Sequence, residues 1–149
     1  MANTYTNLLY HLIFSTKERH PLISPEIQEP LYLYIGGIVR QQKGVLLAVG
    51  GMPDHIHLLV NLRAEPSLAL HLKAIKGSSS RRINRANPEL RFAWQAGYGA
   101  FSVSQSQVRR VRRYIQEQPK HHRQTSYKEE LTSLLERNRV KYDERYLLG

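Results

Sequence analysis

The stretch Gly50-Gly51-Met52-Pro53-Asp54-His55-Ile56-His57-Leu58-Leu59-Val60 decides the fold, because a turn leads directly into an apolar run with two histidines. Side chains alternate between the two faces of a strand, so an extended run places His55 and His57 on the same face. The sequence therefore predicts a strand over residues 55–62 that presents two imidazoles on one face. Its opposite face is apolar, formed by Ile56, Leu58, Val60 and Leu62.

Two imidazoles at this spacing allow two interpretations. Neutral rings on one face of a strand can both bind a single divalent ion. They can equally be strand histidines that are held by ordinary hydrogen bonds. This stretch alone does not distinguish the two interpretations, so residues elsewhere in the chain are needed to decide between them.

The composition is that of a basic domain. A length of 149 residues fits one domain, residues 1–149. The 22 Lys and Arg residues exceed the 12 Asp and Glu residues, which gives a net charge of +10. This excess favours a polyanionic partner, with nucleic acid ahead of an anionic membrane surface.

Several classes are excluded by what the sequence lacks. Without cysteine there can be no disulfide, zinc–thiolate site or cysteine nucleophile. No secretory signal is recognisable, and no apolar run approaches the roughly 18 residues that a membrane span needs. We therefore expect a soluble intracellular protein that does not insert into a membrane.

Hydrophobic periodicity predicts an α+β fold. The order is strand, helix, strand, strand, helix, strand, which is that of a ferredoxin-like antiparallel sheet (βαββαβ) with helices on one face. We expect the other face to stay open for a ligand, nucleic acid or a partner. The predicted strands are 5–15, 45–49, 55–62 and 97–103, and the predicted helices are 25–43 and 67–87.

A third helix is predicted over residues 105–118, with Ser104 as its cap. Tyr114 and Gln118 lie one turn apart and fall together at one edge of its apolar stripe. A fourth helix is predicted over 126–138, followed by an end segment, 142–148, that packs down. The histidines between these two helices, His121 and His122, are interpreted as surface residues.

Tyr114 and Gln118 suggest chemistry that fits a histidine pair. A phenol can attack phosphorus and form a covalent intermediate, although its ordinary pKa of about 10 requires a nearby cation. A glutamine oxygen could supply a third ligand to an ion at His55 and His57. The alternative is a packed core tyrosine with a surface glutamine. His11 is a candidate neighbour of the site, and Asp54 points to the opposite face if the strand includes it.

Together, the segments 54–60 and Tyr114-Ile115-Gln116-Glu117-Gln118 resemble the HUH single-tyrosine transposases. These are the small enzymes of hairpin-ended, single-stranded insertion sequences and of their relatives associated with repeated palindromes. Three further segments are also similar to that family, namely residues 72–80, 95–103 and 142–146. The resemblance thus spans nearly the whole chain.

The resemblance implies a role for each matching residue. His55 and His57 correspond to the metal-binding histidines, Gln118 to the third ligand, and Tyr114 to the tyrosine that attacks a DNA phosphodiester. The implied product is a 5′-phosphotyrosine with a free 3′-hydroxyl, and reversal of the attack joins strands without ATP. The implied substrate is single-stranded DNA with hairpin ends, and the implied ion is Mg²⁺ or Mn²⁺.

The resemblance also implies an assembly and a location. Many members of the family are homodimers in which the tyrosine helix of one subunit completes the histidine site of the other. The location is cytoplasmic and DNA-associated, in a bacterium.

Basic side chains on two predicted helices are candidate phosphate contacts. Exposed rings at Trp94 or Tyr98 could stack an unpaired base. Each of these residues could equally be a solvated charge or a packed ring. The basic candidates are Lys73, Lys76, Arg81, Arg82 and Arg85 in the second helix, and Arg109, Arg110, Arg112 and Arg113 in the third.

Two other functions compete with a strand transferase. One is a non-catalytic single-stranded nucleic-acid-binding module, which is disfavoured because the strands lack the aromatic pairs that such ferredoxin-like binders use. The other is a nuclease in which a metal-bound water attacks. Two histidines without a strong carboxylate pair disfavour it.

Overall fold

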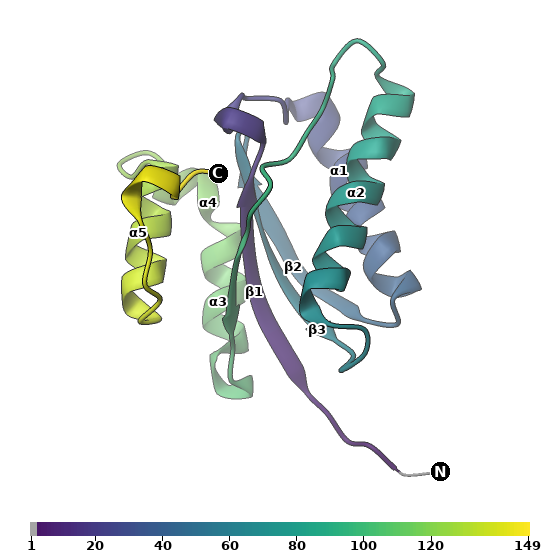
Figure 1. Ribbon diagram of the computed structural model, residues 1–149, viewed down its shortest axis with the longest axis vertical. Coiled ribbons are helices and arrows are strands. Elements are labelled where there is room, and N and C mark those ends of the chain that lie inside the picture. Colours follow the sequence, from purple (N-terminus) through teal and green to yellow (C-terminus); the bar gives the residue numbers. More distant parts are fainter. Residues whose placement is uncertain (1–2) are drawn as a thin grey trace.

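A four-stranded antiparallel sheet forms the centre of the computed structural model, which describes residues 3–149 (Figure 1). Its strand order is β2-β3-β1-β4, so β1 and β3 are the central pair. This confirms the predicted α+β class and βαββαβ order. The strands are β1 (Leu8–Ser15), β2 (Val45–Met52), β3 (His55–Leu62) and β4 (Gly99–Ser102).

One face of the sheet is covered by α1 (Pro25–Gln41) and α2 (Leu68–Ala86) (Figure 1). The Ser67 hydroxyl caps α2 by accepting a hydrogen bond from the Leu70 amide. Alternation along β3 directs its apolar row into this layer, as predicted. The main core lies here and includes Leu12, Phe14, Leu31, Ile35, Ile56, Leu58, Val60, Leu72 and Ile75.

The opposite face is covered by α3 (Val108–Gln116), α4 (Gln118–His121) and α5 (Tyr127–Arg137) (Figure 1). The expectation that this face stays open is therefore wrong. The physical reason is that the face is itself partly apolar, since Ile13, Leu59 and Phe101 point into it. These residues pack against side chains of α3 and α5, including Ile115, Leu131, Leu134 and Leu135.

The predicted helix 105–118 is divided in the structure. A 3₁₀ turn, η2 (Gln105–Gln107), precedes α3, and the chain leaves helical geometry at Glu117 before α4 begins. Pro119 explains the break, because proline lacks an amide hydrogen and its ring clashes with the preceding turn of a helix. Ser104, the predicted cap, makes no side-chain capping bond.

The C-terminal segment follows the prediction more closely. Ser126 and Glu129 form a capping box that starts α5. After α5 the chain turns through η3 (Glu144–Tyr146), and Tyr142, Leu147 and Leu148 pack against the α5 cluster. A short 3₁₀ turn, η1 (Lys17–Arg19), follows β1.

The predicted ends of some strands differ from those in the structure. β1 begins at Leu8 rather than at residue 5, and β2 runs on to Met52. Within residues 3–149, no helix has the length and hydropathy that would let it span a bilayer.

Candidate active site

His55 and His57 extend from β3 toward α3, α4 and α5, and both side chains are fully buried. Their ring centres lie 5.3 Å apart. Ile56 and Leu58 point into the core on the other side of the sheet. The predicted alternation along this strand is confirmed.

Each histidine is oriented by a partner at its Nδ1 atom. Asp54 Oδ1 lies 2.7 Å from His55 Nδ1, and His11 Nε2 lies 2.8 Å from His57 Nδ1. Asp54 was expected on the opposite face only if the strand included it; it belongs instead to the turn before β3, where strand alternation does not apply. Both histidines therefore direct Nε2 into the site, the arrangement typical of metal-ligating histidines.

Glu130 of α5 connects all parts of the site. Its Oε1 atom lies 2.9 Å from His57 Nε2, 3.3 Å from His55 Nε2 and 3.0 Å from His122 Nε2. Its Oε2 atom accepts hydrogen bonds from the Tyr114 hydroxyl and, at 2.9 Å, from the Gln118 amide. One buried carboxylate thus contacts five side chains that come from β3, α3, α4 and the loop after α4.

Tyr114 and Gln118 reach the histidines even though the helix is broken between them. The Tyr114 ring centre lies 5.7 Å from that of His57. Gln118 is fully buried rather than at the surface, and its Oε1 atom lies 3.1 Å from His55 Nε2. The structure therefore brings together all four residues singled out from the sequence, within a single chain.

Two histidines interpreted as surface residues belong to this site. The His122 side chain is 7% exposed; its Nδ1 donates to the Thr125 carbonyl, and its Nε2 lies 3.0 Å from Gln118 Oε1. The His121 ring packs on Tyr114 with centres 4.6 Å apart, and its buried Nε2 has no partner among the described residues. The surface interpretation is wrong because the turn after α4 folds both rings inward.

Glu130 was not identified from the sequence, although a signal was present. It lies three residues after Tyr127 and four before Leu134, which places it on the apolar stripe of α5. A carboxylate is rarely buried unless it has partners. An acidic residue on the buried stripe of a helix therefore indicates a polar cluster on the facing sheet.

The charges in the site are set by burial and by Glu130. Burial alone would lower the pKa of His55, but hydrogen bonds to Asp54 and Glu130 raise it to about 9. Burial lowers the pKa of His57, and burial together with His57 lowers the pKa of His11 to about 3. Burial opposes ionisation of Glu130, yet the surrounding histidines hold its pKa far below the usual range. The buried carboxylate thus faces His55, whose pKa is raised, and His57, whose pKa is lowered.

Tyr114 is held in its protonated form. Burial and the negative charge of Glu130 both raise its pKa well above the ordinary value. A phenol in this environment is a poor nucleophile until positive charge is placed beside it. A cation beside the phenol would lower its pKa and so favour attack by Tyr114.

The donor atoms fit a divalent metal ion. The ligand atoms of His55, His122 and Glu130 all lie within 4.8 Å of one another. The amide oxygen of Gln118 lies about as close to the same imidazoles. Imidazole nitrogen combined with amide and carboxylate oxygen suits borderline ions such as Mn²⁺ as well as oxygen-loving Mg²⁺.

The predicted basic residues lie on both sides of the sheet, on α2 and on α3 (Figure 1). Lys76 differs from the rest: it is half-buried and donates to the carbonyls of Ala96 and Gly97 at 3.0 and 2.8 Å. Arg82 lies over the Tyr34 ring, and Arg81 donates to Ser78. Contacts to DNA remain a prediction for these residues. The exposed ones are Lys73, Arg81, Arg82, Arg85, Arg109, Arg110, Arg112 and Arg113.

Curated relatives of this chain are transposases. The ISDra2 transposase TnpA of Deinococcus radiodurans is 31% identical over 117 residues, which cover 74% of this chain and 84% of that protein. The transposase of insertion sequence element IS200 of Salmonella typhimurium is 27% identical over 128 residues, 79% of this chain and 81% of that protein.

Solved structures show the same fold. A crystal structure described as a candidate transposase from Deinococcus radiodurans R1 matches with a TM-score of 0.64 and 30% identity, over 77% of this chain and 94% of that one. A REP-associated tyrosine transposase bound to a REP hairpin matches with a TM-score of 0.60, over 82% and 73%. Its 17% identity makes this a likeness of fold alone.

The sequence model of the family described as IS200-like transposases matches residues 4–118. This range contains His55, His57, Tyr114 and Gln118, whereas Glu130 and His122 lie beyond it. The resemblance noted from the sequence is thereby confirmed, and the chain belongs to the family of IS200-like transposases.

Proposed function

We propose that this transposase cuts and rejoins single-stranded DNA through a covalent bond between Tyr114 and a 5′-phosphate. The observation that carries the proposal is the position of the Tyr114 hydroxyl. It binds the same carboxylate that contacts Nε2 of His55 and of His57. A nucleophile next to a set of metal-binding atoms is the arrangement that phosphoryl transfer by a phenol needs.

The proposed reaction exchanges one phosphate ester for another. A bond forms between Tyr114 Oη and phosphorus, and the bond between phosphorus and the 3′-oxygen breaks. Overall, the phenol proton ends on the released 3′-hydroxyl, so neither water nor ATP is consumed. Reverse attack by a 3′-hydroxyl restores Tyr114 and joins the strands.

The chain's own residues prepare the site for this exchange. A divalent ion, Mg²⁺ or Mn²⁺, held by His55, His57 and Gln118 would polarise the scissile phosphate and stabilise the leaving oxygen. Asp54 and His11 hold the two histidines in position.

Glu130 occupies contacts that a phosphate oxygen would use. Its carboxylate already receives hydrogen bonds from Tyr114 and Gln118 and lies against three imidazoles. The cluster is thus suited to an anion. A DNA phosphate has to take over these contacts from Glu130 when it enters.

The proposed substrate is single-stranded DNA with hairpin ends. A net charge of +10 suits a polyanion, and the solved REP-associated relative is bound to a REP hairpin. A homodimer is the proposed assembly and rests on the resemblance. Because His55 and Tyr114 of one chain share the site here, the chemistry can be tested in cis before any exchange between subunits is invoked.

The test is to incubate the protein with labelled hairpin DNA that carries a single-stranded flank, in Mn²⁺, and to examine a denaturing gel. A covalent adduct is expected, and it should be lost in Tyr114→Phe and in His55→Ala. Tyr146→Phe, at a tyrosine that is 72% exposed, serves as the matched control and should keep the adduct. Cleavage without an adduct that survives Tyr114→Phe would indicate a nuclease instead. Binding without cleavage would indicate a non-catalytic binding module.

A further inference from the structure

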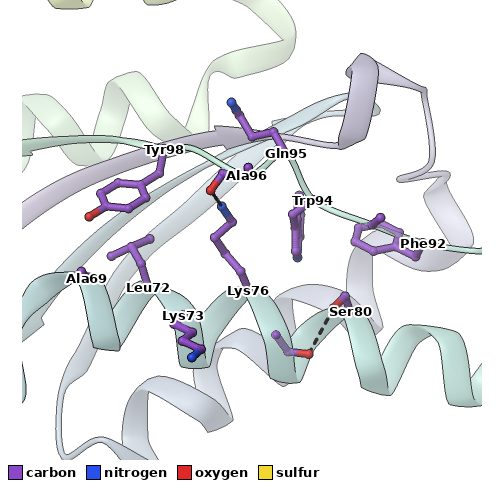
Figure 2. Close-up of a pocket in the computed structure, with 12 residues that line it drawn as sticks. Ala69, Leu72, Lys73, Lys76, Ser80, Phe92, Trp94, Gln95, Ala96 and Tyr98 are labelled. Carbon is purple, nitrogen blue, oxygen red and sulfur yellow. Dashed lines mark hydrogen bonds between the residues drawn. The ribbon is translucent and has the colours of Figure 1, made fainter. Parts of the chain in front are cut away.

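A cavity of about 450 Å³ lies between α2 and the segment that precedes β4 (Figure 2). It is lined by six residues of α2 and by residues 92–96 and 98. α2 covers the face of the sheet opposite the histidine cluster, so this cavity is separate from the candidate active site (Figure 1). Its size is in the range of small-molecule sites, about 300 to 1,000 Å³.

The walls of the cavity are held in place by the fold. The Trp94 ring meets Phe14 and Phe92 edge-on, with centres 4.8 Å apart in each case, and its Nε1 donates to Ser79 at 3.0 Å. Figure 2 shows Lys76 rising from α2 between Trp94 and Tyr98, with its amine bound to Ala96. A preformed wall lowers the entropy lost when a ligand binds.

The lining of the cavity includes Gly77, a glycine within α2. A Cβ atom at Gly77 would meet only the flexible end of Arg81, at 3.2 Å. Glycine in a helix interior is unfavourable relative to alanine. At this position the lining of the cavity therefore carries no side chain.

The side chains that line the cavity favour a flat, negatively charged ligand. Two lysines and no carboxylate are among the described residues that line the cavity. Lys73 is exposed, and Tyr98, which is 41% exposed, lies with its ring 5.8 Å from the Lys76 amine. A nucleotide combines the two features that this lining can bind, because its base stacks on aromatic rings and its phosphate pairs with lysine.

The cavity lies at the same end of β1 as the active site. Thr16 pairs with Trp94, and the neighbouring Ser15 pairs with His55. The backbone N–H of Gln95 donates to the Ser15 carbonyl, and the Gln95 side-chain oxygen accepts from the Ser15 N–H. A DNA strand that passes this end of the sheet can thus contact the cavity on one face and Tyr114 on the other.

We propose that this cavity binds one unpaired nucleotide of the DNA strand, with the base on Tyr98 and the phosphate at Lys73, beside the segment that reaches Tyr114. The proposal rests on the proposed function, because it assumes a single-stranded flank as substrate. Trp94 is the chain's single tryptophan, so its fluorescence reports directly on the cavity.

The test uses the Tyr114→Phe background, which the proposed reaction predicts will bind DNA without cleaving it. Two probes are titrated: a hairpin oligodeoxynucleotide with a single-stranded 5′ flank, and the same hairpin with a blunt end. The flanked hairpin is expected to change Trp94 fluorescence saturably, and the blunt hairpin to leave it unchanged. Tyr98→Ala should weaken binding of the flanked hairpin by roughly 5- to 100-fold, the usual range for one stacked base.

Gly77→Leu fills the cavity without adding charge and should abolish the fluorescence change while the helix stays folded. Gly37→Leu is the matched control on α1, where a Cβ would meet only Arg40 at 3.8 Å, and it should bind normally. Lys73→Met should weaken binding, whereas Lys141→Met, at an exposed lysine of the tail, should not.

An equal response to both hairpins, or unchanged affinity in both Gly77→Leu and Tyr98→Ala, would overturn the proposal. The two proposals fail separately. An adduct on Tyr114 without a change in Trp94 fluorescence contradicts only the proposed nucleotide site in the cavity. A Trp94 response without any adduct contradicts only the proposed reaction.

Discussion

Tyr114 and Glu130 lie sixteen positions apart on two different helices, and the phenol of the first donates a hydrogen bond to the carboxylate of the second. The same carboxylate lies against His55 and His57. Glu130 thus connects the residue that would attack DNA to the residues that would bind the ion. It lies on α5, outside the region that the family model matches.

Replacing Glu130 with glutamine is expected to lower the pKa of Tyr114. Burial is the largest cause of the raised pKa of Tyr114, and the negative charge of Glu130 is the next. Without that charge the pKa should fall but stay above the ordinary value. Tyrosine-selective ¹³C NMR titration of the metal-free protein measures this, with Tyr114→Phe assigning the resonance. Glu129→Gln, at the exposed neighbour on α5, should leave the pKa unchanged. An unaltered value in Glu130→Gln would show that burial alone raises it.

Asp54→Asn is expected to weaken Mn²⁺ binding by about 10- to 100-fold, the usual effect of losing a carboxylate that orients a ligating histidine. Asp54 receives the Nδ1 hydrogen of His55 at 2.7 Å and so leaves Nε2 free to bind the ion. Isothermal titration calorimetry measures the affinity. The control is Asp143→Asn, because Asp143 pairs with Arg145 at the surface. Equal affinities in the two variants would remove His55 from the ligand set.

Gly50→Ala is expected to displace the helix that carries Tyr114. Gly50 lies on β2 opposite His57, and a Cβ there would stand 2.2 Å from the backbone oxygen of Ile115. Overpacking of this kind lowers the free energy of unfolding by about 1–3 kcal/mol, and adduct yield should fall with it. Urea denaturation measures the first effect. At Gly36 of α1 a Cβ meets only side chains, at 3.5 and 3.6 Å, so Gly36→Ala should retain stability.

Lys76 should make stability depend on pH in the alkaline range. Burial lowers its pKa from the ordinary 10.5 to about 8. Between these values the unfolded chain binds more protons than the folded chain, so this residue makes stability rise with pH across that window. Urea midpoints of the wild type and Lys76→Met, compared below and above the window, should converge as pH increases. Lys73→Met, three residues earlier and exposed, should keep a constant difference from the wild type.

The sequence predicted best where one pattern determines one element. Alternation from His55 to Leu62 predicts both the bounds of β3 and the shared face of its histidines, because a buried row on one side leaves no other register. Ser67 likewise predicts the start of α2, since its hydroxyl satisfies an amide that the helix leaves free.

Prediction failed where distant segments meet. Whether the second face of the sheet is open depends on how residues 108–148 pack, and helical periodicity predicts α3 and α5 without saying which surface each covers. For the same reason the sequence did not identify Glu130 and misplaced His122, because their contacts with the histidines of β3 join segments that are far apart in the sequence. Their roles arise only after α4 and α5 fold onto β3.

The order of β3 and α5 along the chain has a consequence for biosynthesis. Translation produces β1 and β3 first, and those strands can pair while the histidine face has no cover. The carboxylate and the leucines of α5 leave the ribosome more than seventy residues after His55. During that interval the chain exposes an apolar and histidine-rich surface, the kind of transient surface that invites aggregation or chaperone binding. Emergence of α5 is therefore the event that both ends this exposure and completes the site.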